Sequence, residues 1–209
     1  MINTETYPLS EKNFIKVKSI KKRILIGNTF SSDMNHYVGW LNRYNGKYKK
    51  TAMFTISFDG KIHQHFEPTY NSAIIGNLTF DESTISILIE NEGWLTKDLN
   101  EENKYITHVG NIYNRTQEVF EKKWRRNKYW SPYTQQQHDS LIYLIDKLCD
   151  EFKIPKNVIP HNTKINNGYS HVGIMYKGNL DIHFTDLNPS WNFIEIKDKL
   201  ELKNIENDK

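Results

Sequence analysis

Two short runs of apolar residues constrain the fold of this chain most strongly. Residues 24–26 read Ile-Leu-Ile, and residues 84–89 are largely apolar and rich in β-branched side chains. A strand of this kind is suited to burial on both faces, as in a central sheet that helices cover. The two runs therefore predict central strands of an α/β fold.

The clearest helical pattern follows Thr134. Thr134 and Gln137 have the spacing of a capping box, which satisfies the first backbone N–H groups of a helix, and Pro155 ends the pattern. Apolar residues recur at helical spacing, and they predict a buried stripe made of Leu141, Leu144, Ile145, Leu148 and Phe152.

Weaker patterns fill in the rest of the fold. Ser31, Ser32 or Asp33 is expected to cap a helix that presents Met34, Tyr37, Val38 and Leu41 and ends at Gly46. Asp59 and Gly60 predict a hairpin turn between strands at residues 51–58 and 62–66. A short strand is expected at residues 158–159, followed by a loop-rich segment to about Phe193. Strands interleaved with helices in this order predict a mixed central sheet flanked by helices.

The chain is expected to form one main domain. Residues 1–20 are predicted to be an extended arm, residues 21–196 the domain, and residues 197–209 a polar, frayed tail. Residues 93–131 are charged and aromatic without a simple period, which predicts an insertion with a short β-ribbon.

Composition excludes several classes of function. The formal net charge of +3 over 209 residues is too small to indicate a nucleic-acid polymer as partner. A single cysteine, Cys149, excludes a disulfide framework and is expected to be a buried thiol. The N-terminus has no apolar signal region and no segment is long enough to span a bilayer, which predicts a cytoplasmic protein without a membrane partner.

The order of elements resembles the type 2 N-acetylmuramoyl-L-alanine amidases, the family of phage amidase lysozymes and peptidoglycan recognition proteins. Four stretches carry the resemblance, and together they span about residues 22–193. They are residues 24–29 (Ile-Leu-Ile-Gly-Asn-Thr), the hairpin at 59–62 with the stretch up to 73–76, the helix headed by 133–137, and residues 185–193 (Thr-Asp-Leu-Asn-Pro-Ser-Trp-Asn-Phe).

The resemblance implies a zinc site in which this chain departs from the family pattern. Such enzymes hold zinc with two histidines and an Asp or Cys, leaving a position open for water. Gly27 stands at the first histidine position, and Asp186 stands at the Asp or Cys position. The second histidine position falls on Lys177 or on His161. Lys177, nine residues before Asp186, matches the family spacing better than His161, which lies 25 residues before it.

Other positions that the resemblance assigns to chemistry differ as well. A Tyr or His pair is replaced by residues 52–54 (Ala-Met-Phe), and an Ala-Trp-His element by residues 73–75 (Ala-Ile-Ile). The acidic residue of the next strand appears as Leu88, with Glu90 two residues further on. The resemblance therefore implies a protein without zinc or other cofactor that has lost catalysis.

A lysine at the second histidine position has two possible roles. The Lys177 ammonium either forms an ion pair with Asp186 in place of the metal, or it faces a ligand and binds its carboxylate or phosphate. The residues expected to contact a ligand are Asn28, Thr29, Glu90, Arg125, Arg126, Lys177, His183, Thr185 and Asp186.

The remaining histidines are expected to be less informative. His63 and His65 alternate on a strand and are predicted to face solvent, with a two-histidine metal site as the alternative. His161 is expected to be structural. His171 and His183 flank Lys177 and are candidates to line the same groove. Residues 124–130 mix cations with aromatic rings, a composition that can stack on sugars and hold phosphates but also occurs on amphipathic surfaces.

Three hypotheses for the function follow. The first is an inactive amidase fold that binds a small ligand, such as a peptidoglycan fragment, in the former active-site groove; a phage protein would reach the wall through host lysis or in a virion. The second is a cytosolic protein that sequesters a phosphorylated nucleotide signal. The third is an active zinc amidase that uses His161, Asp186 and another histidine.

Overall fold

A mixed sheet of eight strands forms the centre of the chain within residues 1–101, 103–115, 118–181 and 187–205, which the computed structural model describes. Neighbouring strands are parallel except for one antiparallel pair, β3 and β4. In spatial order the strands are β1 (Ile2–Asn3), β4 (Ile62–Gln64), β3 (Phe54–Ile56), β5 (Thr84–Ile89), β2 (Arg23–Asn28), β11 (Gly173–Tyr176), β10 (Asn157–Val158) and β12 (Lys203–Asn204). The predicted mixed central sheet is confirmed.

The two apolar runs form the middle of this sheet, as predicted. β2 and β5 pair in parallel from Arg23 opposite Thr84 to Asn28 opposite Ile89, and every residue of both strands is buried. Because β3 and β11 run in the same direction, the carboxyl ends of four strands meet at one edge. In open parallel sheets this edge is where ligands bind.

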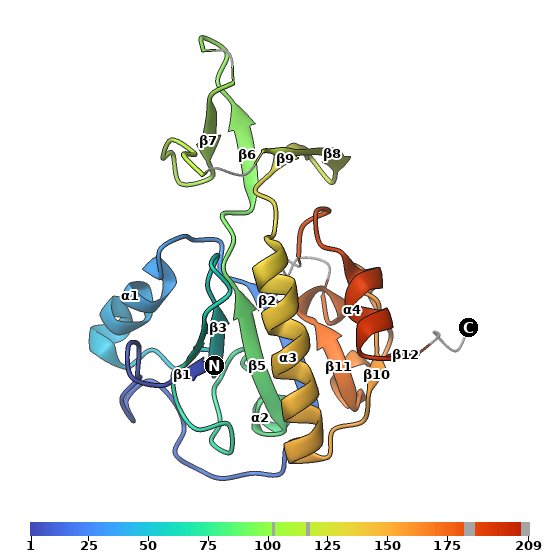
Figure 1. The fold of residues 1–209 in the computed structure, drawn as a ribbon. Coiled ribbons are helices and arrows are strands. Elements are labelled where there is room, and N and C mark those ends of the chain that lie inside the picture. The colour runs from blue at the N-terminus through green and yellow to red at the C-terminus, as the bar shows by residue number, and fades with distance from the viewer. Residues whose placement is uncertain (102, 116–117, 182–186, 206–209) are drawn as a thin grey trace.

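Helices cover both faces of the sheet. α3 (Gln135–Phe152) lies across one face with α4 (Phe193–Lys199) beside it (Figure 1). Thr134 and Gln137 form the predicted capping box, and the predicted stripe is buried up to Leu148. The shorter helices are α1 (Asn35–Asn42), η1 (Arg43–Gly46), α2 (Leu78–Glu82), η2 (Gly168–Ser170) and η3 (Lys177–Asn179).

A second, smaller sheet stands on the edge where the strands end (Figure 1). It is antiparallel, and it replaces the short ribbon expected for residues 93–131. Its strands in spatial order are β7 (Tyr105–Thr107), β6 (Trp94–Lys97), β9 (Asn127–Trp130) and β8 (Phe120–Trp124). Phe30 anchors it to the main sheet, with ring centroids 5.5 Å from Trp94 and 5.7 Å from His108.

The loop-rich expectation for residues 160–193 is wrong at β11. This strand lies between β2 and β10 and is buried throughout. It is only four residues long, and its stability comes from pairing on both sides, which a local pattern does not reveal. Gly173 lets the strand begin there, because its φ is 127° and a Cβ would lie 2.4 Å from the Asn157 carbonyl oxygen.

The ends of the chain are more ordered than expected. In the N-terminal segment, Ile2 and Asn3 pair with β4, and the buried Phe14 ring stacks on Phe66 with centroids 4.6 Å apart. The prediction of a frayed tail from Lys197 is wrong as far as Asn204, because α4 continues to Lys199 and β12 pairs with β10.

The start of the first helix differs from the sequence-based expectation, whereas the environment of the single cysteine agrees with it. The predicted caps of the first helix are wrong, because α1 begins after Met34, whose φ of 57° makes the turn into the helix without a side-chain cap. Cys149 is a buried free thiol, as expected. Among the described residues, no helix has the length and apolar character needed to cross a membrane.

Candidate functional site

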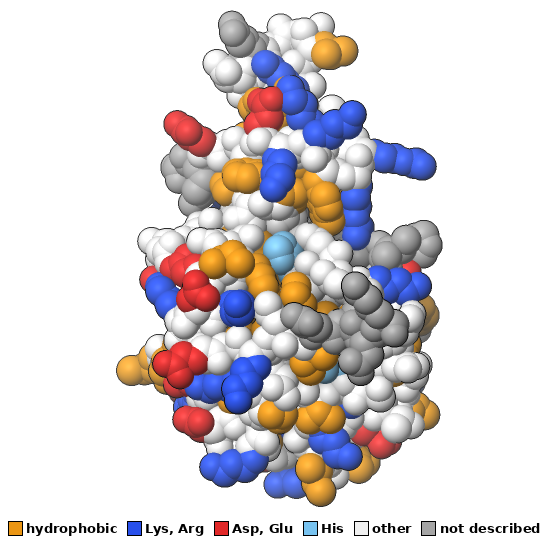
Figure 2. Space-filling model, turned by 90° about the vertical axis from the view of Figure 1, so that its right-hand side faces the viewer, with side chains coloured by type: hydrophobic (Ala, Val, Ile, Leu, Met, Phe, Trp, Pro, Cys, Tyr) orange, Lys and Arg blue, Asp and Glu red, His pale blue; other side chains and the backbone are white. Residues whose placement is uncertain are grey.

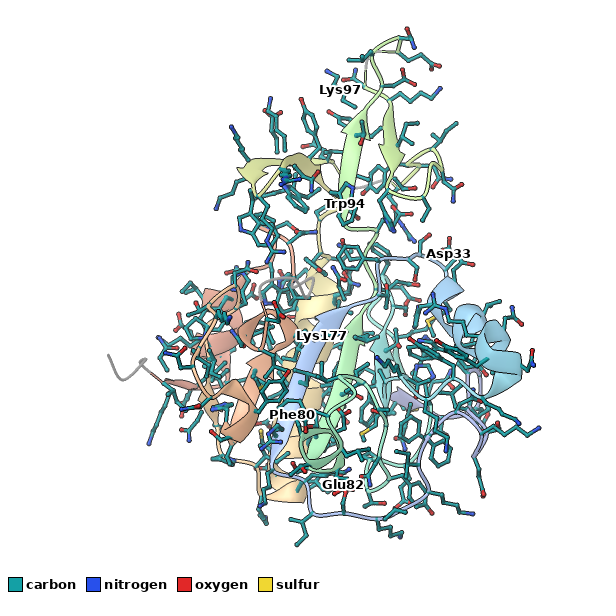
Figure 3. All side chains as sticks on the ribbon, turned by 180° about the vertical axis from the view of Figure 1, so that it is seen from behind. Asp33, Phe80, Glu82, Trp94, Lys97 and Lys177 are labelled. Carbon is teal, nitrogen blue, oxygen red and sulfur yellow. The ribbon has the colours of Figure 1, made fainter. Side chains whose placement is uncertain are left out.

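A cleft of about 560 Å³ opens at the carboxyl ends of β2 and β5. Its volume falls within the range of pockets that bind small molecules. Its walls come from residues 28–50, residues 74–75, Leu88, Lys177 and the small-sheet residues 108–109. Figure 3 shows Lys177 lying across the central strands on the face away from α3, with Trp94 above it at the root of the small sheet.

At the base of this cleft, the Lys177 side chain occupies the space next to Gly27 that a side chain at position 27 would need. A Cβ atom on Gly27 would lie 2.5 Å from Lys177 Cδ and 3.1 Å from its Cγ. Leu88 Cδ2 lies 3.2 Å from the same point. The aliphatic part of Lys177 therefore fills the space into which a side chain at position 27 would project, and the two residues are complementary in shape.

This arrangement does not fit the zinc site that the resemblance implies. Glycine supplies no donor at the first position, and the ammonium of Lys177 is no metal ligand while protonated. Asp186, the third position, lies outside the described residues. Within the described residues there is no group of three His, Cys, Asp or Glu side chains that could hold a metal ion.

His161, the alternative second ligand, is not among the residues that line the cleft. Its ring packs against Tyr176 and Phe193, with centroids 5.9 Å and 5.6 Å away. Burial lowers its pKa to about 4, so the ring is neutral at neutral pH. These contacts support the structural role that the sequence suggested.

The described lining of the cleft has positive side chains and no acidic ones. Arg43, Lys50 and Lys177 contribute the cations, while Phe30, Trp40 and Tyr48 contribute aromatic surface. The Arg43 guanidinium stacks over the Tyr48 ring at 5.2 Å. A cleft walled by low-dielectric protein and lined by one sign of charge attracts ligands of the opposite charge.

A chain of hydrogen bonds leads from the cleft into the protein. The Tyr7 carbonyl can only accept, so His65 donates to it through Nδ1 at 2.7 Å. His65 Nε2 then accepts from Thr55 Oγ1 at 2.9 Å, and Thr55 Oγ1 accepts from His36 Nε2 at 3.0 Å. His36 Nδ1 accepts from Ser31 Oγ at 3.3 Å. With both imidazoles neutral, this network fixes each ring in one tautomer.

Burial is the main cause of this neutrality. It lowers the pKa of His36 to about 3 and that of His65 to about 4. The prediction that His63 and His65 face solvent is wrong, because both are buried. The N-terminal segment covers them: Tyr7 packs edge-on against His63 with centroids 4.9 Å apart.

Glu90 serves the backbone and does not line the cleft. One carboxylate oxygen accepts from the Met34 N–H at 2.6 Å, and the other accepts from the Phe58 N–H at 3.3 Å. Burial raises its pKa, and these hydrogen bonds oppose the rise. Glu90 is therefore outside the wall of this cleft, in which Thr29 lies, and its role as a ligand-binding residue stays a prediction.

The small sheet brings one of the two predicted arginines to the site. Arg125 makes the turn between β8 and β9 and stacks over the Trp124 ring at 4.4 Å. It lines a narrow slot that Asn28 also lines. Arg126 is exposed and lines neither hollow.

The remaining predicted residues fall elsewhere. His171 is buried at the start of β11, the end opposite Lys177, where its Nε2 is 3.2 Å from the Ile174 carbonyl oxygen. The candidates His183, Thr185 and Asp186 lie outside the described residues. Sequence reasoning missed His36, Arg43, Lys50 and His108, because no local motif marks them and only the fold gathers them at the cleft.

Comparison with known proteins identifies the family. The family model described as N-acetylmuramoyl-L-alanine amidase matches residues 19–171, so Lys177 and Asp186 lie beyond the matched range. No curated relative matches this chain by sequence.

Three solved structures, two amidases and one hydrolase, have a similar fold at low sequence identity. N-acetylmuramoyl-L-alanine amidase LysC from Clostridium intestinale URNW is 17% identical with a TM-score of 0.53, covering 97% of this chain and 99% of its own. AmiD from E. coli, solved with anhydro-N-acetylmuramic acid-L-Ala-D-gamma-Glu-L-Lys, is 12% identical with a TM-score of 0.57, covering 95% and 67%. Staphylococcus aureus AmiA, in complex with its ligand, is 10% identical with a TM-score of 0.53, covering 96% and 81%. The family match covers well over half of the sequence, and this chain belongs to the N-acetylmuramoyl-L-alanine amidase family.

Proposed function

We propose that this chain is a non-catalytic member of its family that binds an anionic peptidoglycan fragment in the cleft and holds no zinc. The observation that carries the proposal is the shared volume of Gly27 and Lys177. A histidine at position 27 would require the Lys177 stem to move away, and without it the first metal ligand is missing. Because the metal supplies the activated water in this family's chemistry, a chain without it binds but does not cut.

The charge of the cleft supports an anionic ligand. Arg43, Lys50 and Lys177 face a hollow whose described lining has no acidic side chain. Muropeptides carry carboxylates, and AmiD was solved with a fragment of this kind. Hydrogen bonds from a charged donor to a carboxylate contribute about 1.5–3 kcal/mol each.

The same three cations favour a second candidate ligand, a phosphorylated nucleotide. Phosphate oxygens are strong acceptors and would use the same side chains. The two candidates differ in what surrounds the anion, a sugar–peptide in one case and a base in the other. A binding experiment with both classes therefore distinguishes them.

The test is calorimetric titration in the presence of a chelator, with the anhydro-muramoyl tripeptide of the AmiD complex and with a cyclic dinucleotide. The tripeptide is expected to bind and to be recovered uncleaved by mass spectrometry. Preferential binding of the dinucleotide would establish the second candidate, and binding of neither would refute both. Amide cleavage after zinc is added would establish an active amidase.

One matched pair of variants locates the binding site. Lys177→Met keeps an unbranched stem over Gly27 but removes the charge, so affinity is expected to fall roughly tenfold or more. Arg126→Met removes an exposed charge that does not line the cleft, and it should leave affinity unchanged. Equal effects of the two variants would place the ligand elsewhere.

A further inference from the structure

The slot beside the cleft is built like a small binding pocket. It lies where the small sheet meets the carboxyl end of β2 and has a volume of about 60 Å³. Figure 2 shows hydrophobic side chains, with Lys and Arg among them, gathered at the base of the small sheet. The slot walls are largely aromatic, and its lining includes Phe30, Trp94, Trp124, Trp130, Arg125 and Asn28.

The aromatic walls are held in place by contacts outside the slot. Trp130 donates from Nε1 to the Lys122 carbonyl at 2.8 Å, and its ring lies 5.3 Å from that of Trp124. Phe30 packs over Gly93, where a Cβ would lie 2.6 Å from the ring, and the φ of 78° at Gly93 suits glycine. The slot is therefore preorganised before any ligand enters.

Asn28 is the polar group that the slot leaves unused. The residue is 7% exposed, and neither its amide nitrogen nor its amide oxygen has a hydrogen-bond partner among the described residues. An unpaired buried amide destabilises the folded state, and such a group calls for an explanation. Asn188, which also lines the slot, is already used: its nitrogen donates to Asn91 Oδ1 and to the Ser131 carbonyl.

The size of the slot selects the group that fits. A cavity of about 150 Å³ holds benzene, so a slot of about 60 Å³ is too small for a nucleobase or a sugar ring. It has room for a methyl group with an attached carbonyl. Asn28 offers one donor and one acceptor in a plane, which complements the C=O and N–H of a secondary amide.

The position of Asn28 connects the slot to the cleft, since Asn28 lines both hollows. A group held in the slot would therefore belong to a ligand whose remaining part lies in the cationic cleft. We propose that the slot is a subsite for an N-acetyl group, with Asn28 pairing to its amide and the tryptophans enclosing its methyl group. This inference rests on the proposed function, because it assigns one part of the ligand that the cleft binds.

The first experiment tests the slot without any muropeptide. N-methylacetamide is titrated into the protein, and the side-chain amide signal of Asn28 and the indole N–H signals are followed by NMR. A saturable shift at millimolar concentration is expected, and it should be weaker with 2-butanone, which lacks the N–H. Shifts that stay linear, or that persist unchanged in Asn28→Leu, would overturn the proposal and leave a slot filled by ordered water only.

The second experiment separates the subsite from the binding function as a whole. N-acetylmuramoyl dipeptide and its de-N-acetylated form are titrated into wild type, Asn28→Leu and Arg126→Met. Wild type and Arg126→Met are expected to prefer the acetylated ligand by roughly tenfold or more, the effect of one buried hydrogen-bonded pair. Asn28→Leu should bind both forms equally.

The outcomes of the two experiments are distinct. Equal binding of both dipeptides by wild type would overturn the subsite and leave the proposed function standing. Binding of neither dipeptide would overturn the proposed function, and the N-methylacetamide titration would then decide the subsite by itself. Asn28→Leu is expected to melt at a higher temperature than wild type, so that loss of binding in this variant cannot be ascribed to unfolding.

Discussion

Gly27 and Asn28 are neighbours at the end of β2, and their surroundings differ in opposite ways. At Gly27, where the resemblance implies a metal ligand, the Lys177 stem fills the space that a side chain would occupy. At Asn28 the aromatic walls leave a slot, and a buried amide has no described partner. The space at one position is filled by a neighbouring side chain, whereas the next position has a buried amide without a described partner.

The two positions differ in the free energy that their surroundings contribute. Where no side chain keeps a space open, neighbouring side chains pack into it and gain dispersion and burial. A buried polar group without a hydrogen bond in a preformed hollow gains nothing in the free protein that offsets its desolvation. Functional sites are where proteins carry costs of this kind.

The largest expected effect is on pH dependence, and it belongs to the Gly27 side. His36 lines the cleft and is connected to His65 through Thr55, whereas the described lining of the slot contains no histidine and no carboxyl group. Both imidazoles stay neutral in the folded state down to pKa values of about 3 and 4, below the ordinary value of 6.5. The unfolded chain binds protons first, so the free energy of unfolding falls as pH drops below about 6.5, by about 1.4 kcal/mol per pH unit for each histidine.

Urea unfolding between pH 7.5 and pH 4.5 measures this slope. Burial lowers the pKa of His161 as well, so it adds to the same slope. A His65→Gln variant loses one of these buried histidines, so its slope should be shallower than that of wild type. A free energy of unfolding that is independent of pH in this interval would contradict the neutral hydrogen-bond chain.

Next in size is the packing of Gly27 against Lys177. Gly27→Ala is expected to destabilise the protein by about 1–3 kcal/mol, because the new methyl group would overpack the Lys177 stem. The loss should largely vanish in a Lys177→Ala background, and a double-mutant cycle measures this coupling. The control is Gly39→Ala in α1, where a Cβ meets nothing within 4 Å and should stabilise the helix. Additive effects at positions 27 and 177 would refute the shared volume.

A substitution at Asn28 is expected to stabilise the protein, whereas the substitution at Gly27 destabilises it. Asn28→Leu replaces an unpaired buried amide by an apolar side chain of similar size, and a stabilisation of about 1 kcal/mol is expected. Asn188→Leu is the matched control, which should destabilise because Asn188 donates two hydrogen bonds. Chemical denaturation measures the free energy of unfolding of both variants. A destabilised Asn28→Leu would mean that Asn28 has a structural partner.

The smallest effect concerns the two arginines of the small sheet. Arg125→Ala removes a guanidinium that stacks on Trp124, and a loss of about 0.5–1 kcal/mol is expected. Arg126→Ala at the neighbouring exposed position should change stability by no more than about 0.5 kcal/mol. Tryptophan fluorescence follows both unfolding transitions. Identical values for the two variants would mean that Arg125 does not brace the slot.

Much of the fold could be predicted from the sequence because its signals are local. The runs at β2 and β5 and the capping box at Thr134 each specify an element within a few residues. β11 could not be predicted, because four residues between a glycine and a lysine become a strand only through pairing with β2 and β10. The order of the chain ends likewise depends on partners distant in sequence, such as Phe66 for Phe14.

Some residues of the candidate site could likewise be predicted from the sequence, whereas others are brought together only by the fold. The proximity of Gly27 and Lys177 could be predicted, because motif positions assigned both residues to one site and they lie in contact. Arg43, Lys50 and His36 could not, since only the three-dimensional fold brings them to the cleft. The hydrogen bonds of Glu90 could not be predicted either, because a sequence does not reveal that the backbone N–H groups of Met34 and Phe58 donate to its two oxygens.

Zinc content tests the central claim most directly. The protein is purified without chelator, dialysed against excess zinc and then against metal-free buffer, and its zinc per chain is measured by mass spectrometry. We expect only trace zinc, because Gly27 supplies no ligand and the Lys177 stem fills its space. Stoichiometric zinc that remains after dialysis would contradict the account and identify the chain as a metal-binding amidase.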